Sequence, residues 1–290
     1  MCKTAWLPLL VVLASAVSAS RAPSLLLRKR EKYLPVVLWH GMGDSCCHPQ
    51  SMGALARRLE SELGTFVHSI ATGHGETSDV LSGFFGDVNA QVDAACAELA
   101  ALPELADGFV AVGFSQGGQF LRAVAQRCQH TLPGPMHTLV TMGSQHQGVM
   151  EVPGCWGPSF NATPTALCRA VEALLSHGAY YDWVQRSVVQ AAYWKDPYNL
   201  DQYRTHSSFL AGRQCVPAPC TPEALSAQRL APVPPRPADI NAESAAEPAK
   251  PHYCTNLASL RSLVLYLFDN DVTVVPKESS HFGWCAGRAT

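Results

Sequence analysis

The stretch that decides the fold is Val110-Ala111-Val112-Gly113-Phe114-Ser115-Gln116-Gly117-Gly118, an apolar run that ends at a serine set among glycines. A buried parallel strand would end near Gly113, and a helix would begin just after Ser115. The tight turn between them needs neighbours without side chains, so that the serine hydroxyl stands clear of the backbone and the amide of Gln116 faces an oxyanion. This pattern predicts a nucleophile elbow; the alternative is an ordinary glycine-rich turn.

The residues after the elbow support the first interpretation. Phe120, Leu121, Val124 and Cys128 recur at helical spacing. A strand, a tight turn and a helix in this order form the context in which a Gly-x-Ser-x-Gly pattern carries catalysis. We therefore expect Ser115 to be a nucleophile on an α/β fold.

Composition limits the class of protein further. The chain has 290 residues, of which 47% are hydrophobic, so it can bury a large core as one domain with insertions. A formal net charge of −2 provides no basic field for nucleic acid or an anionic membrane. Cys215 and Cys220 have only loosely the spacing of zinc ligands, so we expect no metal site.

The N-terminus has the pattern of a signal peptide, which we expect to span residues 1–19. Lys3 precedes the apolar run Trp6–Leu13, and small residues follow it. This run is shorter than the roughly 20 apolar residues of a membrane-spanning helix, and no later stretch reaches that length. The mature chain should therefore lie in the secretory pathway without a transmembrane segment. The full sequence has eleven cysteines; Cys2 lies in the signal peptide, and the other ten are expected to pair.

A second glycine turn follows an early strand. The run from Tyr33 to Trp39 predicts a buried strand, and it leads into His40-Gly41-Met42-Gly43-Asp44. In hydrolases with a nucleophile elbow, a backbone N–H from such a loop is the second oxyanion donor. Met42 is our candidate. The alternative is that His40 and the glycines only close a tight turn.

Two amphipathic faces separate this turn from the elbow. The first consists of Met52, Leu55, Leu59 and Leu63, and the second of Val80, Phe84, Val88, Val92, Cys96 and Leu99. Helices here would place Cys96 and Cys128 near the ends of neighbouring helices, which makes this pair a plausible disulfide. For the adjacent Cys46 and Cys47, spacing favours two separate partners, because a mutual bond closes a strained eight-membered ring.

A further buried strand is predicted at residues 138–143, and it ends in Ser144-Gln145-His146-Gln147-Gly148. His146 would lie at the sheet edge where such folds carry their sites. The order in this fold is nucleophile, acid, histidine, and His146 precedes every plausible acid. We therefore interpret it as a loop or pocket residue.

Regularity changes over residues 151–256, which we interpret as an inserted cap. Amphipathic stretches lie around residues 171–175 and 184–193. Asn161 begins an Asn-Ala-Thr glycosylation acceptor, and Cys155 and Cys168 could staple the loop around it. Residues 213–251 are rich in Pro and Ala and lack an apolar face, so we expect disorder there.

The last predicted strand covers Leu260 to Phe268, and Asp269-Asn270-Asp271 follows it, where the acid of a triad is expected. Spacing does not decide between Asp269 and Asp271. Only 19 residues follow Asp271, too few for a crossover and another parallel strand. His281 is the sole histidine after the acid, and we do not expect it to reach Ser115 as a base.

Four motifs together resemble the palmitoyl-protein thioesterases, lysosomal serine hydrolases that remove fatty acyl groups from cysteine thioesters. They are Trp39–Cys47, the run from Gly113 to Cys128, Gly143–Gly148 and Tyr193–Pro197. The likeness covers roughly residues 33–210 and, less closely, 256–284.

The resemblance implies an α/β-hydrolase fold, with core residues at 33–150 and 257–290 around the cap. It implies that Ser115 is the nucleophile, that Met42 and Gln116 supply the oxyanion amides, and that Asp271 is the acid. No metal or cofactor is implied. It further implies the disulfides Cys46–Cys47, Cys96–Cys128 and Cys155–Cys168. The implied substrates are S-acylated proteins or peptides and acyl thioesters, and the implied location is the lysosome.

Two departures from the family pattern create alternatives. The proline-rich insert interrupts the family's cap, and the printed sequence ends before the family's last helix, strand and catalytic histidine. The last strand is therefore expected to be missing. One alternative is a lipase or carboxylesterase, since the elbow serves both. The other is an inactive, truncated relative that binds acyl chains or partners. A chain that misfolds without the last strand would be secreted or retained in the endoplasmic reticulum.

Overall fold

The computed structural model describes residues 33–151, 170–171, 173–175, 178–211 and 251–284. The predicted signal peptide, Asn161, the Cys155–Cys168 pair and residues 213–250 of the proline-rich segment lie outside the described residues. The helices are α1 Met52–Leu63, α2 Glu76–Ser82, α3 Val88–Ala100, α4 Gln116–Cys128, α6 Asp182–Ser187, α7 Val189–Ala192, α8 Leu200–His206 and α9 Pro251–Ala258, with 3₁₀ helices η1 Pro103–Asp107 and η3 Lys277–His281. Within the described part, no helix is long and apolar enough to cross a membrane.

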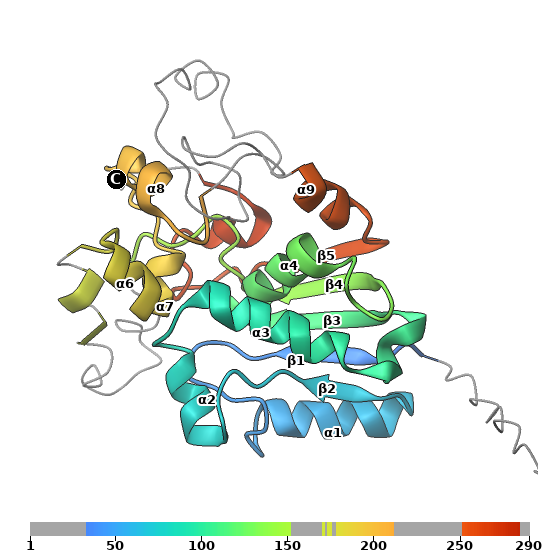
Figure 1. The fold of residues 1–290 in the computed structure, drawn as a ribbon. Helices are drawn as coiled ribbons and strands as arrows, with labels where there is room; N and C mark the ends of the chain where they lie inside the picture. Colours follow the sequence, from blue (N-terminus) through green and yellow to red (C-terminus); the bar gives the residue numbers. More distant parts are fainter. Residues whose placement is uncertain (1–32, 152–169, 172, 176–177, 212–250, 285–290) are drawn as a thin grey trace, which may run out of the picture. The chain divides into compact units, whose positions relative to one another are not determined.

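The described strands form one parallel sheet in the order β2-β1-β3-β4-β5 (Figure 1). They are β1 Val36–Trp39, β2 Val67–Ser69, β3 Phe109–Phe114, β4 Met136–Met142 and β5 Ser262–Tyr266. The four strands predicted from apolar runs are all present, and β2 is additional. Trp39 is in register with Gly113, and Met142 pairs with both Phe114 and Tyr266. The carboxyl ends of β1, β3, β4 and β5 therefore meet at one edge.

The strand pattern explains the layers on either side of the sheet. Successive side chains of a strand point to opposite faces. On one face, Val36 and Leu38 of β1 pack with Met52 of α1. On the other face, Trp39 packs edge-on against Phe120 of α4, with ring centroids 5.4 Å apart. Helices α3 and α4 cover this second face, and α9 packs against α4.

The second amphipathic segment differs from its prediction. Instead of one helical face from Val80 to Leu99, the chain forms α2 and α3 with a break at residues 83–87. Gly86 adopts φ 129°, which a helix excludes, and the carboxylate of Asp87 caps α3 by accepting the backbone N–H of Asn89. The break lets the carbonyl of Phe84 accept the N–H of Val189.

The segment of residues 178–211, which contains α6, α7 and α8, is attached to the sheet end as well as to this break. The N–H of Val149, after β4, donates to the carbonyl of Tyr193, and the N–H of Lys195 donates back to Val149. Phe85 and Val188 form an isolated antiparallel bridge. Residues predicted to belong to the cap therefore lie next to the loops at the carboxyl end of the sheet.

Candidate active site

Ser115 stands between β3 and α4 in a strained backbone conformation. Its φ is 51°, and among the described non-glycine residues only Phe282 is also positive. The N–H of Ser115 donates to the carbonyl of Met142 at 2.8 Å, and its own carbonyl accepts the N–H of Gly118 at 3.1 Å. This conformation is typical of a nucleophile held on a sharp strand-to-helix turn.

Glycines let the elbow and the turn after β1 approach closely. A Cβ on Gly117 would lie 2.4 Å from the carbonyl oxygens of both Trp39 and His40. A Cβ on Gly41 would lie 3.4 Å from Cβ of Ser115. Met42 follows Gly41 in this turn, and Gln116 is the first residue of α4. Both predicted oxyanion donors thus come from backbone next to Ser115.

Ser115 and Asp271 line the same cavity, whose volume is about 260 Å³. The remaining lining residues are mainly apolar: Phe114, Met142, Gly143, Phe268, Thr273 and Val274. Ser115 follows β3 and Asp271 follows β5, so the cavity lies at the shared carboxyl edge of the strands. Apolar walls with a few converging polar groups are typical of a site for an apolar ligand.

Asp271 is oriented by its own loop. Its Oδ1 accepts the N–H of Thr273 at 2.8 Å and that of Val274 at 2.9 Å. Its Oδ2 would lie 3.4 Å from a Cβ on Gly143, so the absence of a side chain there leaves room for the carboxylate. Asp269 is exposed and does not line the cavity. Of the two aspartates that spacing left open, only Asp271 lines the cavity that Ser115 lines.

None of the described residues that line this cavity is a histidine. His146 is completely buried, with Nε2 3.0 Å from Oγ1 of Thr141 and its ring stacked on Phe282. Burial, with a smaller contribution from Arg122, lowers the pKa of His146 well below its usual range. His281 is exposed, and its Nε2 lies 3.3 Å from the carbonyl oxygen of Leu265.

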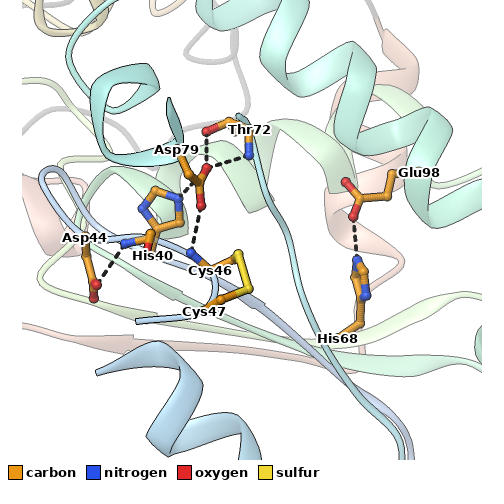
Figure 2. The surroundings of a disulfide bond; sticks show 9 residues. His40, Asp44, Cys46, Cys47, His68, Thr72, Asp79 and Glu98 are labelled. Atoms are coloured by element: carbon orange, nitrogen blue, oxygen red, sulfur yellow. Dashed lines mark hydrogen bonds and ion pairs between the residues drawn. A yellow bond between two sulfur atoms is a disulfide. The ribbon is translucent and has the colours of Figure 1, made fainter. Parts of the chain in front are cut away.

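A buried pair of charged side chains lies beneath the turn that carries Met42. Nε2 of His40 is 3.3 Å from Oδ1 of Asp79, and both residues are almost fully buried. Figure 2 shows Asp79 among His40, Cys46 and Thr72. Its Oδ2 accepts the N–H of Cys46 and its Oδ1 accepts that of Thr72, each at 2.7 Å. Sequence reasoning missed Asp79, since an acidic residue at the edge of an amphipathic helix gives no signal.

The environment of this pair favours its charged form. Burial by itself would lower the pKa of His40, but the hydrogen bonds to Asp79 and to the carbonyl of Gly41 raise it above 6.5. Burial would raise the pKa of Asp79, yet the hydrogen bonds from His40 and from the N–H of Cys46 lower it to about 2. Both shifts favour an ion pair between His40, which precedes the turn after β1, and Asp79 of α2.

Two disulfides join pairs of described residues. Cys96 of α3 is bonded to Cys128 of α4, with the two Cα atoms 6.1 Å apart. Cys46 is bonded to Cys47 (Figure 2). The expectation from spacing that these two have separate partners is wrong: the turn between β1 and α1 accommodates the small ring, with the N–H of Cys46 held by Asp79.

A parallel sheet whose central strand passes through a strained serine into a helix defines the α/β-hydrolase class of protein. Sequence comparison gives the particular group within that class. The chain belongs to the palmitoyl protein thioesterase family, whose family model matches residues 35–214 and 238–290.

Individual relatives agree with this assignment. The chain is 40% identical over 280 residues to palmitoyl-protein thioesterase 1 of Caenorhabditis elegans, covering 96% of this chain and 79% of the relative. It is 29% identical over 253 residues to palmitoyl-protein thioesterase 3 of Dictyostelium discoideum, covering 87% and 70%. Overlap with solved structures is partial. The RedJ thioesterase of Streptomyces coelicolor shares 17% identity over 49% of each chain, with a TM-score of 0.32. The fold assignment therefore rests on the sheet topology and the family match.

Proposed function

We propose that this chain hydrolyses long-chain acyl thioesters and removes palmitoyl groups from cysteine side chains of proteins or peptides. The observation that best supports the proposal is that the strained Ser115 lines a mainly apolar cavity together with Asp271. Membership of the palmitoyl protein thioesterase family supports the thioester as the bond attacked.

In the proposed reaction, Oγ of Ser115 attacks the carbonyl carbon of the thioester as its proton passes to a base. The C–S bond breaks, the cysteine sulfur leaves and takes up a proton, and the acyl group stays on Ser115 as an ester. Water then attacks this ester, releases the fatty acid and restores the serine hydroxyl. Backbone N–H groups of Met42 and Gln116 donate to the oxyanion in both steps, and each such donor is worth about 10²–10³ in kcat.

Asp271 is proposed to orient the base. Two backbone amides fix its Oδ1, and its Oδ2 lies on the side of Gly143, which also lines the cavity. A carboxylate in this position accepts a hydrogen bond from an imidazole and stabilises it when it is protonated. No histidine in the described part of the chain lines the cavity, so we assign the base to none of these residues.

We further propose that the protein acts in the lysosome, which it reaches through the secretory pathway after loss of residues 1–19. The disulfides Cys46–Cys47 and Cys96–Cys128 support an oxidising compartment on the way. Residues 151–250 are proposed to cap the acyl site, with a sugar at Asn161 and a Cys155–Cys168 bridge; residues 251–256, predicted to end the cap, instead belong to α9, which packs against α4. Contact between residues 178–211 and the loops after β4 supports this arrangement.

The test is labelling and turnover of the secreted protein. A fluorophosphonate probe should label the wild-type chain, and a palmitoyl-cysteine peptide should be hydrolysed. Ser115→Ala should lose both, whereas Ser259→Ala, which alters an exposed hydroxyl, should lose neither. A folded protein that the probe does not label would contradict catalysis. Faster turnover of an acyl-glycerol ester than of the thioester would contradict the proposed substrate.

A further inference from the structure

The short helix α7 and the residue after it contact the side chains of both proposed oxyanion donors. Nε2 of Gln190 donates to Sδ of Met42 at 3.1 Å and to the carbonyl oxygen of Gly83 at 3.0 Å. The hydroxyl of Tyr193 donates to Oε1 of Gln116 at 3.2 Å. Gln190 and Tyr193 are three residues apart, which on a helical turn places them on the same side.

The contact of Tyr193 with Gln116 is buried, and that of Gln190 with Met42 is partly buried. Gln116, Gln190 and Tyr193 are 2%, 0% and 1% exposed. Solvent therefore does not replace a hydrogen bond that is lost here, and the abandoned partner stays unsatisfied. Burial raises the pKa of Tyr193 above its usual range, so its hydroxyl keeps its proton and remains a donor.

Three elements approach Gly83, which lies in the break between α2 and α3. They are the turn after β1, the start of α4 and the segment with α7. A Cβ on Gly83 would lie 3.2 Å from Nε2 of Gln116 and 3.4 Å from the backbone nitrogen of Gly43. Met42 lies in the turn after β1, and Gln116 begins α4. The segment with α7 is thus a third element that reaches both, through residues far away in the chain.

An oxyanion hole depends on the direction of two N–H groups relative to the reacting carbon. Misplacement of a catalytic group by about 1 Å can cost about 10²-fold in rate. A side chain that is held by a buried partner restrains the peptide plane to which it is attached. Without that partner, the side chains of Met42 and Gln116 gain rotational freedom, and the peptide planes to which they are attached lose one of their restraints.

We infer that Gln190 and Tyr193 are positioning residues, which hold the side chains of Met42 and Gln116 so that their backbone amides converge on the substrate oxyanion. The inference rests on the proposed function, because it takes these two amides as the oxyanion donors. In this arrangement a segment predicted to belong to the cap sets the geometry of the catalytic core, in addition to any contact with the acyl chain.

Two variants remove the polar contacts and keep the shape of the side chains. Tyr193→Phe deletes one hydroxyl, and Gln190→Met replaces the amide by a thioether. For each, kcat should fall about tenfold with KM within about twofold, because the oxyanion is stabilised in the transition state and the substrate is not. Tyr180→Phe is the matched control: its hydroxyl contacts Trp194 and Asp196 in the same segment and neither donor. Wild-type kcat in Tyr193→Phe would overturn the inference.

A double-mutant cycle tests whether Tyr193 acts through Gln116. Gln116→Met removes the acceptor of the hydroxyl and keeps the backbone amide. The double variant with Tyr193→Phe should then lose no more in kcat than Gln116→Met alone, and the same holds for Gln190→Met combined with Met42→Leu. Losses that multiply would mean that Gln190 and Tyr193 act by another route, which would overturn the inference.

Amide hydrogen exchange separates this inference from the proposed function, because it needs no turnover. Exchange at Met42 and Gln116 should accelerate about fivefold or more in Tyr193→Phe and Gln190→Met, and stay unchanged in Tyr180→Phe. Unchanged exchange in the first two variants would overturn the positioning role whether or not the protein is active. A wild-type chain without thioesterase activity would instead refute the proposed function.

Discussion

The two halves of the candidate site are held by different means. Around Ser115, the backbone of Gly117 packs against the carbonyls of the turn after β1, and the buried pair of His40 and Asp79 anchors that turn. Asp271 lies after the edge strand β5, next to Val272, which is 53% exposed, and amides of its own loop orient it. Tertiary packing fixes the nucleophile half and local hydrogen bonds fix the acid half. Substitutions in the first half should therefore cost stability as well as activity, and those in the second activity alone.

The largest effect is expected for Asp271→Asn, which tests the acid half. It should lower kcat by about 10³–10⁴, because the wrong tautomer of the base is then favoured. Stability should change by less than about 1 kcal/mol, because the side-chain oxygen still accepts the amides of Thr273 and Val274. Thioester hydrolysis and thermal unfolding measure the two effects. Asp269→Asn is the control and should keep full activity; equal losses in both variants would contradict the choice of Asp271.

Gly117→Ala tests the nucleophile half. Its new Cβ would lie 2.4 Å from two backbone carbonyl oxygens, which cannot move away as a flexible side chain could. We expect a loss of about 3 kcal/mol in the free energy of unfolding and about 10² in activity from the displaced turn. The control is Gly64→Ala, at φ 61° with no atom within 4 Å of the new Cβ. It should cost only about 1 kcal/mol and leave turnover intact; similar costs for both glycines would contradict the packing argument.

A smaller effect is expected from pH acting on the buried pair. The pKa of Asp79 is lowered from 3.8 to about 2, so its stabilisation is present above about pH 4 and is lost as pH falls through 2. The pKa of His40 is raised from 6.5, so its stabilisation is complete below that value and is lost as pH rises through the folded-state pKa. The wild-type chain should have a higher free energy of unfolding than Asp79→Asn. This difference should be largest, about 2 kcal/mol, between about pH 4 and 6.5. Denaturant titrations across pH measure this difference, and a constant difference would show that charge plays no part.

The strands of the sheet were predictable where apolar runs end at glycine or polar residues. This held for β1, β3, β4 and β5. Strand β2 was missed because Val67–Ser69 is three residues long and only Val67 is buried. The break between α2 and α3 was also missed, since the apolar spacing continues through it, although Gly83, Gly86 and the cap at Asp87 were visible in the sequence.

Site residues that belong to a short sequence motif could be predicted, whereas residues whose partners are distant in the chain could not. Ser115, Gln116 and Met42 belong to short motifs with a known geometry. Asp79, Gln190 and Tyr193 act through partners that are distant in the chain; the contact of Gln190 with Met42, for example, spans 148 positions. No periodicity or composition encodes such contacts, because they depend on how separate elements pack. The choice between Asp269 and Asp271 likewise needed the position of the loop after β5.

The disulfide between Cys96 and Cys128 encloses the nucleophile in a covalent ring. The two cysteines are 32 positions apart, and the whole of β3 with Ser115 lies between them. A single protease cut between α3 and β3 would open the chain without releasing a fragment. The ring also persists when the protein unfolds, where it reduces the entropy of the loop by an amount worth about 4 kcal/mol on the chain-entropy model. As long as this bond is oxidised, Cys96 and Cys128 stay linked even in the unfolded chain, so the segments that form α3 and α4 remain tethered to each other at these two residues.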